Sequence, residues 1–236
     1  MSVEVGYTGG FGNNLFQYAV GRAFAEKNGL ELVSTLPHPF KTTVPKSGWV
    51  HDTPLIEINE GNIDEHFEAP AKMARYYVTG YFQQSMRYVR NRDMIRGFFD
   101  FPKLPKNTKD IVVHLRQDDY GLAHRIHWSW YLKILEAESF QRLYIVTMNR
   151  ELHADYLSKF AKWEPTVVNQ QYLQDFTFIS SFDKMIIANS TFSWWAAFLG
   201  DPSKVYVFKP WLPKGVGPIS LIDFQNSIPV DGDFME

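Results

Sequence analysis

The chain has 236 residues, of which 45% are hydrophobic, and its formal net charge is −2. This length fits one large domain or two small ones, and the near-neutral net charge does not indicate a nucleic-acid-binding surface. The sequence contains no cysteine, which excludes disulfides, thiolate metal sites and a cysteine nucleophile.

The chain opens with a strand–loop–helix–strand pattern. Residues 3–7 can form a strand, and from Leu15 onward apolar residues recur at the period of a helix with one buried face. Gly29 is well placed to end that helix, and residues 30–34 predict a second strand.

The next part of the chain is less regular. Residues 36–70 are rich in proline and show little periodicity, so we expect irregular structure there. A strand is predicted at 75–79 and a helix at 84–96. The segment FPKLPKNTKD at 101–110 combines two prolines with three lysines and has no period, which makes it the best candidate for a linker.

Strands and helices alternate beyond this linker. The expected strands lie at 110–115, 142–147, 166–169, 184–188 and 204–208. The expected helices lie at 129–138, 149–160 (capped by Asn149), 173–182 and 194–199 (ended by Gly200). This alternation predicts a doubly wound parallel sheet with helices on both faces. The expected fold is therefore α/β, with two Rossmann-type halves, residues 1–105 and 106–236, that face each other across a cleft.

Ligands of such sheets bind beside the carboxyl ends of the strands, so the loops at those ends carry the functional information. The first loop, GGFGNN at 9–14, places three glycines before a helix but matches neither GxxxxGK[ST] nor GxGxxG. Bare backbone N–H groups at a helix N-terminus can bind an anion. A tight turn without a ligand explains the glycines equally well.

The second loop, HLRQDDY at 114–120, contains Arg116 at the mouth of the sheet. A guanidinium at such a place needs an anionic partner. That partner is either Asp118 or Asp119, or the diphosphate of a ligand. The two aspartates do not form a D-x-D motif, and we expect no metal site.

The third loop lies in MIIANSTFSWWAAFLG at 185–200, where a buried strand runs into small polar residues at the start of a helix. One of them would suffice as a helix cap, and additional hydroxyls suit phosphate oxygens. We expect Trp194 and Trp195 to pack as helix core rather than to stack on a ligand.

Four stretches together resemble the α-1,2-fucosyltransferases. GGFGNNLFQYAVGRAFA is similar to the family's opening motif G-G-L-G-N-Q-L-F-Q-Y-A, and GYFQQSMRY (80–88) is similar to G-Y-F-Q-S-x-x-Y. HLRQDDY resembles H-x-R-R-G-D-Y, and IIANSTFSWWAAFL matches the family's C-terminal motif. The four stretches occur in the family's order and span most of the chain.

The resemblance implies a GT-B-like fold and a glycosyltransferase activity. The enzyme would move L-fucose from GDP-β-L-fucose to a hydroxyl of a glycan acceptor, O2 of a galactose, with inversion and without a metal. GDP-fucose would be a co-substrate, and no other cofactor is implied. We expect residues 1–105 to form the acceptor side and residues 106–236 to bind the nucleotide sugar. The N-terminal stretch MSVEVGYTGG has no basic segment followed by an apolar run, so we expect no signal peptide. We also expect a cytoplasmic protein with no integral membrane segment.

The resemblance also implies roles for individual residues. Gly10, Gly12 and Asn13 would lie against the donor or the acceptor. His114 would lie beside the nucleotide base, and a carboxylate at Asp175 could accept both N1–H and N2–H of guanine. The remaining donor-binding residues would be those of the third loop: Asn189, Ser190, Thr191 and Ser193.

Arg116 would be the essential arginine that holds the β-phosphate of the departing GDP. Asp119 is the first candidate for the base that deprotonates the acceptor hydroxyl, although it could instead orient Arg116. His127 is the next candidate, and it could equally be a surface residue.

Two alternatives stay open because Gln117 and Asp118 stand where the family has arginine and glycine. The chain could be a GT-B transferase for another nucleotide sugar, which the preference of Asp175 for guanine would test. It could also be a nucleotide- or glycan-binding protein with degenerate catalysis.

Overall fold

The computed structural model describes residues 1–34, 53–116, 124–148, 151, 153–213, 221–224 and 226–235. The chain divides into two compact units. Unit 1 comprises residues 1–83 and 90–101, and unit 2 comprises residues 84–89 and 102–236. The chain therefore enters unit 2 briefly, returns to unit 1 and then passes into unit 2 again. Nothing in the sequence pattern indicated that residues 84–89 belong to unit 2.

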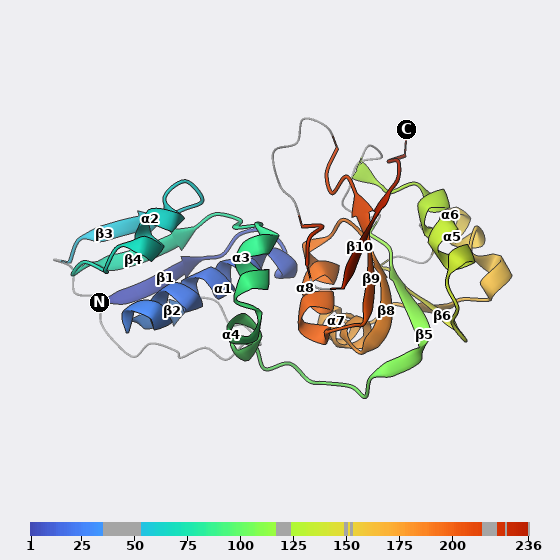
Figure 1. Cartoon of the computed structure of the whole chain (residues 1–236), viewed down its shortest axis with the longest axis horizontal. Coiled ribbons are helices and arrows are strands. Elements are labelled where there is room, and N and C mark those ends of the chain that lie inside the picture. Colours follow the sequence, from blue (N-terminus) through green and yellow to red (C-terminus); the bar gives the residue numbers. More distant parts are fainter. Residues whose placement is uncertain are drawn as a thin grey trace. The chain divides into compact units, whose positions relative to one another are not determined.

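Unit 1 is built around a four-stranded parallel sheet in the order β2-β1-β4-β3 (Figure 1). Its elements are β1 (Ser2–Gly6), α1 (Phe11–Asn28), β2 (Glu31–Ser34), β3 (Leu55–Ile58), α2 (Ile63–Glu68), β4 (Arg75–Thr79) and α4 (Arg92–Gly97). A helix with one buried face was expected, but residues 15–21 of α1 are all buried, so its middle is covered on every side. The helix ends at Gly29, which adopts the left-handed conformation at φ 61°. The Gly29 N–H donates to the carbonyl of Glu26, as expected for a glycine that closes a helix.

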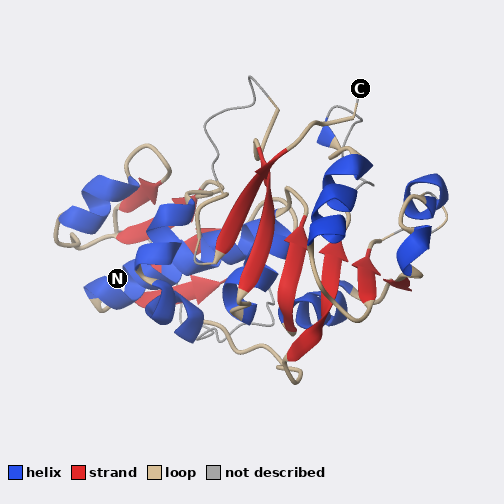
Figure 2. Ribbon diagram, turned by 45° about the vertical axis from the view of Figure 1, so that its right-hand side comes forward, coloured by secondary structure: helices blue, strands red, loops and turns tan. Residues whose placement is uncertain are grey.

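Unit 2 is built around a six-stranded sheet in the order β10-β9-β8-β5-β6-β7, in which every neighbouring pair is parallel (Figure 2). Its strands are β5 (Asn107–His114), β6 (Leu143–Val146), β7 (Thr166–Val168), β8 (Phe182–Ile187), β9 (Lys204–Lys209) and β10 (Ser227–Asp231). Its helices are α3 (Ser85–Arg90), α5 (Trp128–Ala137), α6 (Ala154–Ser158), the 3₁₀ turn η2 (Ala161–Trp163), α7 (Tyr172–Ser180) and α8 (Thr191–Gly200).

Helices cover both faces of the sheet in unit 2, as the alternating pattern predicts. On one face, Ile111 and Val113 of β5 belong to a buried cluster with Trp130 and Tyr131 of α5. Side chains alternate along a strand, so Val112 points to the opposite face, where α7 and α8 pack together and against β8. Among the described residues, no helix is both long enough and apolar enough to cross a membrane.

Each sheet has a topological switch point, where successive connections leave a strand in opposite directions. In unit 1 the switch point lies between β1 and β4, which are neighbours in the sheet but not in the sequence. In unit 2 it lies between β5 and β8. The loops after the two strands of a switch point diverge to opposite faces, and this is where ligands bind in open α/β sheets. All three loops singled out in the sequence follow a strand that borders a switch point.

Several predicted element boundaries were wrong in unit 1. Helix α1 begins at Phe11 rather than Leu15, so the third glycine of the first loop lies inside the helix. Residues 36–70 were expected to be irregular, but β3 and α2 form within their described part. Both elements are short, and β3 is an edge strand, so neither leaves a clear period in the sequence.

The single helix predicted at 84–96 is two helices, α3 and α4, with Asn91 as the N-cap of the second. The break falls where the chain passes between units, so the two helices pack in different cores. The expected linker at 101–110 is shorter, because β5 already begins at Asn107, whose N–H donates to the carbonyl of Ser181.

Two further differences concern unit 2. Strand β10 was missed, since Pro229 interrupts its pattern; proline is tolerated there because β10 is an edge strand. Helix α8 begins at Thr191 instead of Trp194. Asn149, the predicted cap of the helix at 149–160, lies outside the described residues.

Candidate functional site

A side-chain hydrogen bond spans the switch point of unit 2. Arg116 lies two residues beyond the end of β5, and its Nη1 donates to Ser190 Oγ, 3.1 Å away, in the loop after β8. The sequence predicted an anionic partner for Arg116, and Asp118 and Asp119 lie outside the described residues. The contact nevertheless places the guanidinium and the start of α8 side by side at the carboxyl edge of the sheet.

The loop after β8 uses its polar residues in different ways. Ser190 is the N-cap residue of α8, but its side chain makes no capping bond and accepts from Arg116 instead. The hydroxyl of Ser193 is fully buried and donates to the carbonyls of Ala188 and Ser190, at 3.4 and 3.3 Å. Ser193 therefore supports the shape of the loop in this conformation, whereas Thr191 is partly exposed.

Asn189 is also structural in part, since its Nδ2 donates to the carbonyl of His124 at 3.2 Å. This bond ties the loop after β8 to the segment that precedes α5. Trp194 and Trp195 are fully buried, which confirms that they pack as helix core.

Aromatic packing brings two more predicted residues to the same edge. The ring of Phe192, in the first turn of α8, lies 5.5 Å from the ring of His114 at the end of β5. On another side, the same phenyl ring lies 5.4 Å from Phe176 of α7. Phe192 therefore packs between His114 of β5 and helix α7, which also carries Asp175.

Asp175 is buried, with 5% of the residue exposed. Both of its carboxylate oxygens accept from the Gln170 N–H, at 3.2 and 3.3 Å. Burial raises the pKa of Asp175 above its ordinary value, and the Gln170 hydrogen bond offsets only part of that rise. Two carboxylate oxygens can accept about four hydrogen bonds, so further acceptor capacity is left for a ligand.

The structure describes one of the two candidate bases. His127 is the N-cap of α5, where its Nδ1 accepts from the Ser129 N–H and lies 2.7 Å from Ser129 Oγ. Its ring also packs on Trp128. The other candidate, Asp119, lies outside the described residues. Within the described part of the chain, no group of three or more His, Asp or Glu side chains is placed to hold a metal ion.

The glycine loop of unit 1 lies at the other switch point, after β1. Gly9 has φ +76°, a conformation that favours glycine, and a Cβ there would lie 2.3 Å from Asn13 Nδ2. Gly10 is the N-cap of α1, and its ordinary φ of −79° is open to any residue. A Cβ added at Gly10 would meet no atom within 4 Å, so neither backbone nor packing requires a glycine there. Gly12 is buried in the first turn of α1.

Sequence reasoning missed the side chains that hold this loop. Gln17 is fully buried, accepts from the Thr8 N–H, and donates to the carbonyls of Thr8 and Gly80. Gln83 Nε2 donates to Asn13 Oδ1 at 3.0 Å. Helical spacing gave no signal for Gln17, because it falls outside the predicted apolar stripe of the helix and is buried all the same. The role of Gln83 depends on the pairing of β1 with β4, which local sequence does not reveal.

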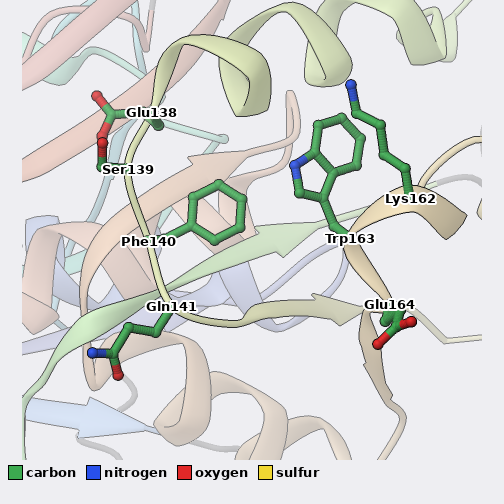
Figure 3. A pocket seen from close by; sticks show the side chains of 7 residues that line it. All are labelled: Glu138, Ser139, Phe140, Gln141, Lys162, Trp163 and Glu164. Carbon is green, nitrogen blue, oxygen red and sulfur yellow. The ribbon is translucent and has the colours of Figure 1, made fainter.

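A pocket of about 440 Å³ lies at the opposite, amino-terminal edge of the sheet in unit 2 (Figure 3). Its lining residues precede β6 and β7: Glu138, Ser139, Phe140, Gln141, Lys162, Trp163 and Glu164. Glu138 already accepts from Lys204 at 2.6 Å. Lys162 pairs with Glu136, and its Nζ sits 4.1 Å from the centroid of the Trp163 ring. The pocket is thus distinct from the strand-end site, and these two charged groups are engaged within the protein.

No protein-family model matches the chain, and no curated protein matches its sequence. Among solved structures, a crystal structure of NodZ alpha-1,6-fucosyltransferase soaked with GDP-fucose is similar, with 14% identity over 90% of this chain and 96% of that chain, and a TM-score of 0.54. A second NodZ structure, co-crystallised with GDP, is 16% identical over 86% and 93% of the two chains, with a TM-score of 0.52. The structure of selenomethionine NodZ from Bradyrhizobium is 15% identical over 90% of this chain and 96% of that chain, with a TM-score of 0.52. At such identities the likeness concerns the fold alone, and the α/β, GT-B-like class expected from the sequence is confirmed: the chain has the fold of these fucosyltransferases.

Proposed function

We propose that the protein is a glycosyltransferase that moves L-fucose from GDP-β-L-fucose to a hydroxyl of a glycan acceptor. The observation that carries the proposal is the hydrogen bond from Arg116 to Ser190 across the switch point of unit 2. It joins a cation to the N-terminus of a ten-residue helix at the edge where α/β sheets bind their ligands. The fold shared with NodZ, one structure of which was soaked with GDP-fucose, supports the same donor.

The chemistry of the donor fits this cluster. Cleavage of the bond between fucose C1 and the β-phosphate oxygen leaves negative charge on GDP. Arg116 is a fixed cation with several N–H donors, and the Ser190 and Thr191 hydroxyls with the N-terminal N–H groups of α8 add further donors. Preorganised donors of this kind stabilise charge that develops in the transition state.

Asp175 is the residue we propose to select guanine. Its carboxylate would accept the N1–H and N2–H of the base, and the His114 ring, which packs on Phe192, would lie beside the base. In unit 1, Gly10, Gly12 and Asn13 would contribute the remaining donor contacts, and the open space at Gly10 suits a close approach of backbone to ligand.

The acceptor and the stereochemistry follow from the motif resemblance. We propose that a galactose O2 attacks fucose C1 from the face opposite GDP, so that the β-linked donor gives an α-1,2 product. The acceptor proton would pass to Asp119 or His127, and GDP would leave without a metal. Residues 1–105 would form the acceptor side, and residues 106–236 would bind the nucleotide sugar.

The variant Arg116→Ala tests the proposal, with Lys162→Ala as a control that removes one positive charge at the opposite edge of the same sheet. We expect kcat/KM for GDP-fucose to fall by about 10²–10³-fold in Arg116→Ala and to stay near wild type in Lys162→Ala. Near wild-type transfer by Arg116→Ala would overturn the proposed role.

Product analysis separates the alternatives. Incubation with GDP-fucose and lactose, followed by NMR of the product, should show fucose on galactose O2 in the α configuration. An α-1,6 product would show that the proposed linkage is wrong, and transfer from a different nucleotide sugar would show that the proposed sugar donor is wrong. Binding of GDP with neither transfer nor hydrolysis would identify a nucleotide-binding protein without catalysis.

A further inference from the structure

The loop that follows β4 in unit 1 is held by a carboxylate from another part of the chain. Glu60, in the connection between β3 and α2, accepts from the N–H of Tyr81 at 2.6 Å and from the N–H of Phe82 at 2.8 Å, both on its Oε1. Two successive backbone N–H groups that converge on one oxygen form an anion-binding nest. The anion in this nest is the protein's own side chain.

The backbone of this loop is strained in a way that the carboxylate explains. Phe82 has φ +52°, which is rare for a residue with a Cβ, and its side chain is 2% exposed. Gly80 has φ +139°, and a Cβ there would lie 2.6 Å from Glu60 Oε2. The glycine thus admits the carboxylate, and the carboxylate offsets the cost of the left-handed residue that follows.

The strained loop leads directly to the site. Gln83 follows Phe82, and its Nε2 donates to Asn13 Oδ1 at 3.0 Å. Asn13 Nδ2 lies against Gly9, so the two ends of the Asn13 amide face fixed and different neighbours. On the other side of the same loop, the Gly80 carbonyl accepts from Gln17, which also holds the glycine loop.

We propose that Glu60 is a positioning residue that sets the orientation of the Asn13 amide through Gln83. The inference rests on the proposed function in one respect only, which is the proposal that Asn13 contacts GDP-fucose. By fixing the turn at 80–82, Glu60 places Gln83 beside Asn13. Gln83 binds the oxygen of the Asn13 amide and thereby determines where the NH₂ group of that amide, its hydrogen-bond donor, is placed. The site in unit 1 is therefore assembled from three segments, after β1, after β3 and after β4.

Amide exchange and NMR test this inference without an activity assay. In the wild type, the Tyr81 and Phe82 amides should be protected from hydrogen exchange, and the Asn13 side-chain NH₂ should give one sharp pair of resonances, assigned by their loss in Asn13→Asp. In Glu60→Ala, both amides should lose protection, and the Asn13 pair should shift or broaden. Glu60→Gln keeps an acceptor oxygen and should retain most of the protection. Glu65→Ala removes an exposed carboxylate of α2 and should change neither signal.

Kinetics then separates positioning from general support of the fold. We expect Glu60→Ala to lower kcat/KM for GDP-fucose about tenfold, because small misplacements of a binding group are costly. If Glu60 acts through Gln83, the double variant Glu60→Ala/Gln83→Ala should be no slower than Gln83→Ala alone.

Unchanged amide protection and unchanged Asn13 resonances in Glu60→Ala would overturn the inference, as would additive kinetic losses in the double variant. A wild-type protein that transfers no fucose would overturn the proposed function instead, and the NMR result would still decide the role of Glu60.

Discussion

At the residue scale, the proposed site contains side chains that are costly for the fold and positions that the fold does not explain. Asp175 keeps a carboxylate buried with Gln170 as its N–H donor, and burial raises its pKa. Gly10 is a glycine at a position where any residue could fit. Features that cost stability, or that packing does not require, are expected where a ligand acts.

The substitution Asp175→Asn should separate stability from binding. A carboxyl whose pKa is raised on folding makes the native state less stable as pH rises from the unfolded to the folded pKa. At neutral pH the variant should therefore melt at an equal or higher temperature than the wild type, and the difference should shrink as pH falls below the ordinary aspartate pKa. Affinity for GDP should fall about tenfold or more, with UDP unaffected. A parallel loss of both nucleotides would argue against guanine selection.

The substitution Gly10→Ala should leave stability nearly unchanged. The added Cβ meets open space, and the loss of a glycine N-cap costs less than about 1 kcal/mol. If a ligand approaches the bare backbone there, the KM for the donor should rise while the melting temperature stays within a few degrees of wild type. Gly9→Ala is the contrasting variant, because its φ of +76° and its contact with Asn13 predict a loss of stability. Unchanged donor KM in Gly10→Ala would remove this residue from the proposed site.

At the element scale, helices α7 and α8 meet at a point where only a glycine fits. A Cβ on Gly200, at the end of α8, would lie 2.3 Å from the carbonyl oxygen and 2.9 Å from the Cα of Ser180, at the end of α7. These are backbone atoms, so the clash is relieved only by moving a helix. Because α8 also carries Ser190 at its other end, the packing of its C-terminus fixes the position of the proposed phosphate-binding turn.

Gly200→Ala should therefore destabilise the protein by about 1–3 kcal/mol, measured by urea or thermal unfolding. Gly97→Ala is the matched control, since Gly97 also ends a helix but a Cβ there would meet no atom within 4 Å. That control should be neutral or slightly stabilising. Equal effects of the two substitutions would contradict the proposed contact.

At the scale of the whole molecule, unit 2 depends on residues 84–89, a segment that residues 90–101 of unit 1 separate from the rest of unit 2. Tyr88 is 1% exposed, and its ring centroid lies 6.0 Å from that of Trp194 and 5.6 Å from that of Trp195. Both tryptophans belong to α8 and are fully buried. A short segment inserted between two parts of unit 1 thus completes the core that supports the site in unit 2.

Tyr88→Ala should cost about 3–5 kcal/mol of stability, as expected for removing a buried aromatic ring, whereas Tyr88→Phe keeps the ring and should cost much less. A fragment of residues 102–236, which lacks this segment, should unfold at lower temperature than the intact chain. Tryptophan fluorescence would report both effects. A fragment as stable as the intact chain would show that Tyr88 is dispensable.

The sequence by itself determined the order of the elements and the candidates for the site. Apolar periodicity located α1 and the alternating elements of unit 2, because a buried helix or strand requires apolar residues at a regular spacing in the sequence. Arg116 and Asn189–Ser193 could be singled out because each follows a buried strand. Periodicity did not reveal β3, α2 or β10, which are short or lie at a sheet edge, where burial is too slight to leave a period.

Only the tertiary structure decided which of these residues meet. The order of strands in each sheet brings the loop after β5 beside the loop after β8, and the loop after β1 beside the loop after β4. That order makes Ser190, a predicted donor-binding residue, a hydrogen-bond partner of Arg116. It also brings Glu60, from a segment with no sequence pattern, to the loop after β4. Strand order arises from contacts between residues far apart in the chain, and no local spacing encodes those contacts.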